Sequence, residues 1–112
     1  MTDYGLNLRQ EQRIARTPQR MKKLNELEYA LKVEGFTTYK RVMPELGGGQ
    51  ILVFGSPELK DENVIASIIY HDFSYGNEYE NLEMAFFEDG EVQEPEVFET
   101  IEEIVDAIHA SM

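Results

Sequence analysis

The sequence predicts an α+β fold, a two-layer sandwich in the order α-β-β-β-β-α whose antiparallel four-stranded sheet consists of two hairpins. Three observations lead to this prediction. Apolar stripes at helical spacing lie in the first third of the chain and at its end, and the residues between them alternate as strands do. Glycine-containing turns divide those strands into two pairs. With 112 residues, of which 42% are hydrophobic, the chain has material for one modest core.

The first predicted helix covers residues 18–34. Thr17 and Pro18 form a typical helix start, in which an N-capping side chain precedes a proline at the first helical position. Gly35 stands where a glycine commonly closes a helix. The apolar stripe of this helix, which we expect in the core, consists of Met21, Leu24, Leu27 and Leu31.

Residues 1–16 lack a comparable apolar period, so we expect a basic, flexible arm there and a single α+β domain over residues 17–112. Four arginines at spacings of 4, 3 and 4 would share one face if the arm became helical. They are Arg9, Arg13, Arg16 and Arg20. Two interpretations stay open: a basic docking arm, or a polar face that pairs with the protein's own acidic half.

The first hairpin is predicted from strands at residues 36–43 and 50–54. The first strand is rich in Thr, Tyr, Phe and Val, and Pro44 ends it. The glycines at positions 47–49 are expected to form the turn, because they match neither the Walker loop nor the dinucleotide-binding pattern. A short capped helical turn is expected at residues 56–59.

The second hairpin is predicted from a strand at residues 64–73 and a type II′ turn at Gly76 and Asn77. That turn places Ile69 opposite Met84. The core face would then hold Ile65, Ile69, Leu82, Met84 and Phe86. The opposite face, with Ala66, Ile68, Tyr70, Ala85 and Phe87, is too apolar to leave in water. A segment of the chain, a partner or a second copy would have to cover it, so a homodimer stays open.

The remaining residues predict a turn and a final helix. Asp89 and Gly90 form the turn, and residues 91–96 are read as a loop or a short edge strand. Thr100 and Glu103 form a capping box, which starts a helix over residues 101–110.

The charges are unevenly distributed and amount to a net charge of −12. Residues 61–112 contain fifteen carboxylates and no Lys or Arg, whereas residues 1–34 have seven basic side chains against five acidic ones. This balance disfavours direct binding of nucleic acid or of anionic membrane. The chain has no cysteine and no apolar run that could span a bilayer. We therefore expect a soluble, cytoplasmic protein.

Few residues suit catalysis or metal binding. His71 stands beside Asp72, but no Ser or Cys nucleophile lies in an elbow-like turn. The twelve residues from Asp72 echo an EF-hand loop, yet Asn77 stands where the sharp turn requires glycine. We therefore predict no enzyme activity, no cofactor and no metal site.

The most distinctive surface is the acidic, tyrosine-rich tip of the second hairpin. Tyrosines are enriched at interface hot spots, and spaced carboxylates complement a basic groove. The predicted partner-binding residues are Asp72, Phe73, Tyr75, Glu78, Tyr79, Glu80 and Glu83. The hypothesis is a non-enzymatic interaction domain that binds a basic protein, such as a nucleic-acid-binding enzyme, as an inhibitor or nucleic-acid mimic. In charge and size alone it resembles acidic inhibitors of phages and mobile elements. The alternatives are an accessory nucleic-acid-associated protein that uses the basic arm, and a self-associating accessory protein.

Overall fold

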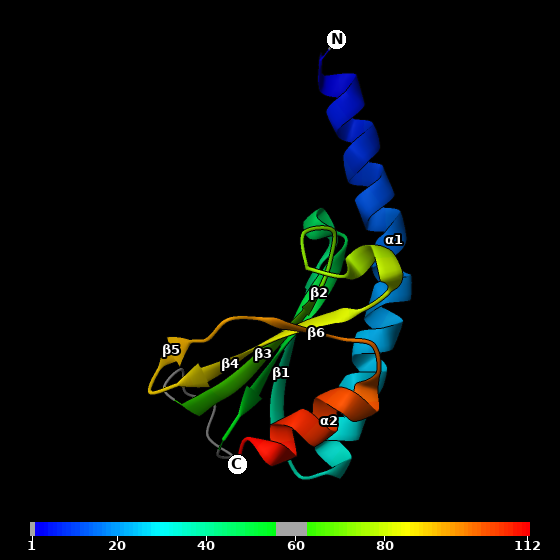
Figure 1. The fold of residues 1–112 in the computed structure, drawn as a ribbon. Coiled ribbons are helices and arrows are strands. Elements are labelled where there is room, and N and C mark those ends of the chain that lie inside the picture. The colour runs from blue at the N-terminus through cyan, green and yellow to red at the C-terminus, as the bar shows by residue number, and fades with distance from the viewer. Residues whose placement is uncertain (1, 56–62) are drawn as a thin grey trace.

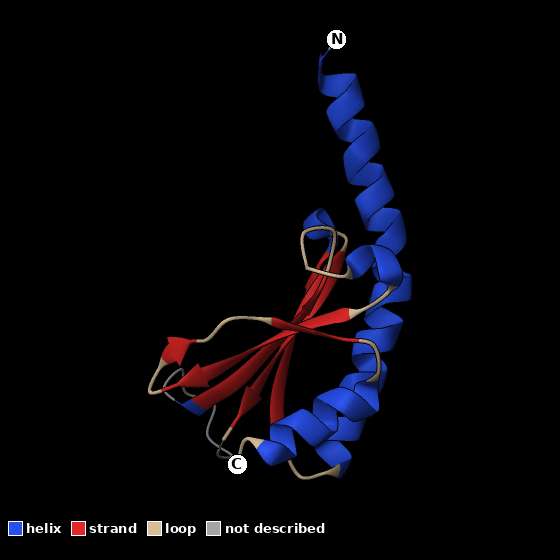
Figure 2. Ribbon diagram, viewed as in Figure 1, coloured by secondary structure: helices blue, strands red, loops and turns tan. Residues whose placement is uncertain are grey.

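The fold is α+β, with a long helix, an antiparallel sheet and a second helix at the end of the chain (Figures 1 and 2). The computed structural model describes the backbone of residues 2–55 and 63–112 and the side chains from Leu8 onward within those ranges. The predicted turn at residues 56–59 lies outside the described residues. The elements are helix α1 (Thr2–Val33), strand β1 (Thr37–Met43), 3-10 helix η1 (Pro44–Leu46), β2 (Gly48–Phe54), β3 (Val64–Tyr70), 3-10 helix η3 (Asn77–Tyr79), β4 (Leu82–Glu88), β5 (Glu91–Val92), β6 (Glu96–Phe98) and α2 (Ile101–Ala110).

The sheet has the order β1-β2-β3-β4, and its far edge is completed by two short strands that both pair with β4. β5 follows β4 through the predicted turn at Asp89 and Gly90, and both residues have positive φ. β6 pairs antiparallel with the first half of β4. The described sheet therefore contains six strands, two more than predicted, because the polar segment after β4 returns once along the edge of β4 and pairs with it in two short pieces, β5 and β6.

Both helices pack against the same face of the sheet, which gives the two layers (Figure 2). α1 contributes the predicted stripe to the core, and Gly35, with φ of +92°, ends it as predicted. α2 begins and ends at the predicted residues, and the hydroxyl of Thr100 accepts a hydrogen bond from the Glu103 amide at 3.1 Å. The fully buried side chains include Leu24, Leu27, Leu31, Ile51, Val53, Ile68, Leu82, Met84, Ile104 and Ile108.

The predicted start of the first helix was wrong, since α1 is continuous from Thr2 through Pro18 (Figure 1). Thr17 does not cap a helix there. Its hydroxyl instead donates to the carbonyl of Arg13 at 2.8 Å, and its side chain is buried. Residues 2–16 thus form the first half of α1, which projects beyond the end of the sheet (Figure 1).

The predicted register of the second hairpin was wrong by one residue. Ile68, and not Ile69, lies opposite Met84. The cause is the connection, because residues 71–81 contain η3 and do not form a two-residue turn. Gly76 does have the positive φ expected of it, but it precedes η3.

A shift of one residue exchanges the two faces of β3, because side chains alternate along a strand. Leu82 and Met84 are buried as predicted, and Ile65 and Phe86 pack at the edge of the core. Ile69 instead lies on the face away from the helices. Its place in the core is taken by side chains that had been assigned to the opposite face, namely Ala66, Ile68 and Tyr70.

Replacement of Pro18 tests whether α1 is continuous. Proline inside a helix removes the hydrogen bond to the carbonyl four residues before and costs up to about 3 kcal/mol. We therefore expect Pro18→Ala to raise the free energy of unfolding by about 1–3 kcal/mol, measured by chemical denaturation with far-UV circular dichroism. Pro44→Ala is the control, because Pro44 occupies the first position of η1, where no hydrogen bond is lost. A neutral or destabilising effect of Pro18→Ala would show that the helix starts at this proline.

Candidate functional site

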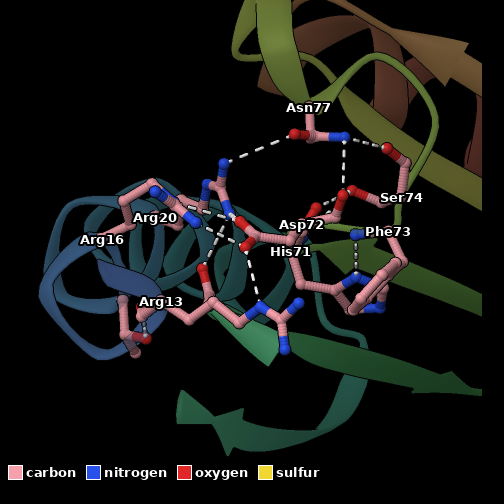
Figure 3. Close-up of polar contacts among 10 residues, drawn as sticks. Arg13, Arg16, Arg20, His71, Asp72, Phe73, Ser74 and Asn77 are labelled. Atoms are coloured by element: carbon pink, nitrogen blue, oxygen red, sulfur yellow. Dashed lines mark hydrogen bonds and ion pairs between the residues drawn. The ribbon is translucent and has the colours of Figure 1, made fainter. Parts of the chain in front are cut away.

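Three arginines of α1 converge on one carboxylate, that of Asp72, the second residue after β3 (Figure 3). Arg16 binds it with two nitrogens, Nε at 3.1 Å and Nη2 at 2.5 Å. Arg20 approaches the carboxylate with Nη1 at 2.5 Å, and Nε of Arg13 lies 3.3 Å from it. Because these residues are spaced by 3 and 4 along a helix, they share one face of α1. We call this group, with Asp72, the arginine cluster.

The electrostatics of the arginine cluster favour the ionised carboxylate. Partial burial of Asp72 opposes ionisation, but the hydrogen bonds from Arg16 and Arg20 outweigh it, so the pKa of Asp72 lies below its usual range. The hydrogen bond to Asp72 in turn raises the pKa of Arg16. The Asp72 side chain is 15% exposed and that of Arg20 is 11% exposed, so solvent screens this contact less than it screens a surface ion pair.

The connection from His71 to Asn81, which we call the β3–β4 loop, is held in shape by its own polar groups. The amide nitrogen of the Asn77 side chain donates to the carbonyl of Ser74 at 2.6 Å and to that of Asp72 at 3.3 Å. The buried hydroxyl of Ser74 accepts from the amide of His71 at 3.0 Å. These bonds satisfy the backbone of a segment that no strand pairs.

His71 has a structural role within the β3–β4 loop. Its side chain is buried, and its Nδ1 accepts a hydrogen bond from the amide of Phe73 at 3.1 Å. Burial lowers the pKa of His71, which keeps the imidazole neutral, as an accepting Nδ1 requires. The buried His71 side chain thus helps to hold the β3–β4 loop through its contact with the backbone.

Further contacts join the far end of the β3–β4 loop to α1. Lys23 donates through Nζ to the carbonyl of Glu80 and, at 3.3 Å, to that of Glu99 before α2. Glu80 has a φ of +61°, which is unfavourable for a residue with a side chain. The Lys23 contact fixes the carbonyl of this strained residue. α1 therefore holds the loop at both ends, through Asp72 and through Glu80.

The predicted partner-binding residues separate into three groups. Phe73, Tyr75 and Tyr79 are 62%, 66% and 75% exposed on the β3–β4 loop. Glu78 and Glu80 are exposed beside them. We call these five residues the aromatic–acidic tip.

Asp72 and Glu83 do not belong to the aromatic–acidic tip. Asp72 is occupied by the arginine cluster. Glu83 lies within β4 on the sheet face away from the helices, and its Oε1 accepts from the amide of Tyr75 at 2.8 Å.

The four arginines of the predicted basic arm also differ in their surroundings. Arg13, Arg16 and Arg20 are in the arginine cluster, and Arg13 also stacks on the ring of Phe73 at 5.0 Å. Arg9 is exposed near the projecting end of α1 and forms no ion pair with another described residue. The pairing of the arginines with the protein's own acidic half agrees with one of the two interpretations left open by the sequence.

In the part of the chain that the structure describes, no three His, Cys, Asp or Glu side chains are grouped so that they could hold a metal ion. No described helix is both long enough and apolar enough to cross a membrane.

Comparison with models of protein families, with curated proteins and with solved structures found no match for this chain. The site therefore has to be interpreted from its own geometry. Sequence reasoning missed the arginine cluster because it assigned Asp72 to the partner-binding surface. The available signal was the spacing of the arginines, together with the single acidic side chain shortly after a buried strand.

Replacement of Asp72 tests the arginine cluster. Asp72→Asn leaves partly buried guanidinium groups without a charged partner, so we expect the free energy of unfolding at pH 7 to fall by about 2 kcal/mol. The pKa of the Asp72 carboxyl is lower in the folded protein than its usual value of 3.8. The stabilisation that this carboxylate contributes is therefore complete when the pH is above 3.8, and it is lost as the pH falls through the pKa of the folded protein. The difference between wild type and variant should therefore shrink in acid.

The matched control is Asp106→Asn, which removes an exposed carboxylate on α2. It should change the stability at pH 7 by less than about 0.5 kcal/mol. An equal, small effect of both substitutions would show that the cluster does not hold the loop to α1.

Proposed function

We propose that the protein is a non-enzymatic interaction domain whose aromatic–acidic tip binds a positively charged partner, as an inhibitor or a nucleic-acid mimic does. The observation that carries this proposal is the exposure of three aromatic rings and two carboxylates on one loop that α1 holds in place. Tyrosine offers a large contact area at little cost in rotamer entropy. A loop that is already ordered loses less entropy on binding than a mobile one.

The distribution of charge supports a basic partner. Between described residues, no ion pair involves any carboxylate from Glu78 to Asp106. Most of these carboxylates are exposed, on the β3–β4 loop, around β5 and β6 and on α2. An uncompensated surface of this kind speeds the encounter with a cationic groove and repels other anions.

The alternative of a nucleic-acid-binding arm receives less support. Phosphate contacts require cationic side chains that face solvent. Three of the four arginines of the predicted arm contact Asp72 instead, and releasing them would leave that carboxylate partly buried and unpaired. The proposal accordingly places the partner on the acidic side and gives the arginines a supporting role.

Binding of an arginine-rich peptide tests the aromatic–acidic tip. We expect wild-type protein to bind the peptide at low salt, more weakly as salt rises, and Glu78→Lys/Glu80→Lys to weaken binding at least about ten-fold in titration calorimetry. Tyr79→Ala should also weaken it, by about five-fold, because the ring supplies contact area.

The charge-matched control is Glu102→Lys/Asp106→Lys on α2, two exposed carboxylates that are not part of the loop. It should weaken binding by less than about three-fold, through the change in net charge alone. If both double variants weakened binding equally and Tyr79→Ala had no effect, the peptide would be responding to diffuse charge, and the proposal of a local site would be wrong.

A further inference from the structure

Neither α1 nor α2 packs over the other face of the sheet, which mixes apolar and polar side chains, and the β3–β4 loop contacts its edge at Glu83 and Val97. Residues that lie opposite one another on neighbouring strands have their side chains on the same face, so the strand pairing shows which residues share this face. One row runs across the sheet as Arg41, Gln50, Ile69, Glu83 and Val97, and the next as Tyr39, Leu52, Ser67 and Ala85. Tyr39 is 47% exposed and Val97 is 45% exposed, and the aliphatic side chains between them are partly exposed. We call these nine residues the open face.

We propose that the open face is the interface of a symmetric homodimer, in which two sheets pack face to face. This inference concerns a different surface from the aromatic–acidic tip and does not depend on the proposed function.

The charge of the open face favours a second copy as its occupant. The whole chain has a net charge of −12, yet the open face carries one arginine and one glutamate and is neutral. Two copies can therefore approach through this face with the least mutual repulsion. A strongly basic partner would instead be directed to the acidic loop and to α2, where the carboxylates lie.

The two charges also stand where a two-fold axis would pair them. Arg41 on β1 and Glu83 on β4 belong to the same row of the register, with β2 and β3 between them. A two-fold axis parallel to the strands and centred between β2 and β3 lays β1 of one copy over β4 of the other. This axis places each row of one copy over the same row of the other copy. Arg41 of each copy then lies opposite Glu83 of the other, which gives two such contacts in the dimer.

Both side chains have capacity for this contact. Among described residues, the Arg41 guanidinium has one hydrogen-bond partner, the sulfur of Met43 at 3.8 Å, and no ion-pair partner. Glu83 uses Oε1 for the Tyr75 amide and has no hydrogen bond at Oε2 with a described residue. At the centre of the open face, the Gln50 side-chain amide donates a hydrogen bond to the hydroxyl of Ser67 at 2.9 Å, so these two polar groups pair with each other. The polar side chains of the open face thus keep partners when the two sheets meet.

The extent of the open face sets the strength of the dimer. The five strands β1, β2, β3, β4 and β6, spaced by about 4.8 Å, present a patch roughly 19 Å wide, and its two rows lie about 7 Å apart along the strands. Such a patch is smaller than the roughly 800 Å² per partner of a standard stable interface. We therefore expect a reversible dimer whose population depends on concentration.

Sedimentation velocity over a wide concentration range tests this dimer with a charge exchange. The wild type should shift from 13.0 kDa toward twice that mass as concentration rises. Arg41→Glu and Glu83→Lys should each raise the dimer dissociation constant at least about ten-fold, because every dimer of one variant contains two like-charge contacts. Mixing the two variants should restore dimers. In each mixed pair, the introduced glutamate faces the introduced lysine at one contact, and the native Glu83 faces the native Arg41 at the other.

The mixing experiment separates loss of the interface from loss of the fold, because a misfolded variant would not recover its partner. Lys22→Glu and Glu102→Lys make the same charge changes on exposed helix positions and should leave the dimer unchanged. A monomer at every concentration would overturn the inference. So would a dimer that the charge exchanges do not weaken, because such a dimer would use another surface, such as the edge of β1 or the projecting end of α1.

Discussion

The shared ion contact of Asp72 with Arg13, Arg16 and Arg20 is the constraint on which the rest of the structure depends. The first half of α1 has little apolar support, since Leu8 and Ile14 are 50% and 54% exposed. The β3–β4 loop has no strand to pair with. Each is ordered by the other, because the arginines approach from one helix face and the carboxylate is fixed at the end of a buried strand. A charge contact here has the role that apolar packing has in the rest of the fold.

This contact also determines which charges remain at the surface. It pairs three arginines of α1 with a single carboxylate, while the carboxylates from Glu78 to Asp106 have no ion-pair partner among the described residues. The fold thereby separates three surfaces of different character: an aromatic–acidic loop, an acidic helix and edge, and a neutral sheet face.

Most of the secondary structure could be predicted from the sequence, because periodicity and capping are local. α2 and its Thr100 cap, the strand at Thr37–Met43 and the Gly35 helix end all follow from such local signals. The register of β3 could not be predicted. Gly76 and Asn77 suit a two-residue turn, but Asn77 instead begins η3 and its side chain bonds within the loop. A change of one residue in the connection then exchanged the two faces of the strand.

The start of α1 and the arginine cluster were missed for a related reason. Pro18 is a strong local signal for a helix start, whereas α1 already includes the residues before it, and Arg16 among them contacts Asp72, 56 positions further along the chain. Tertiary contacts of this range leave no periodic trace in a sequence. The spacing of the arginines indicated a helix face, but it did not identify the carboxylate that this face would meet.

A double-mutant cycle between Arg20 and Asp72 tests the central claim most directly. The free energies of unfolding of wild type, Arg20→Gln, Asp72→Asn and the double variant are measured by chemical denaturation at pH 7. The structure predicts a coupling energy of about 1.5–3 kcal/mol, because the contact is short, charged and partly buried. A coupling energy near zero would contradict the account, because helix and loop would then be held together by something other than this contact.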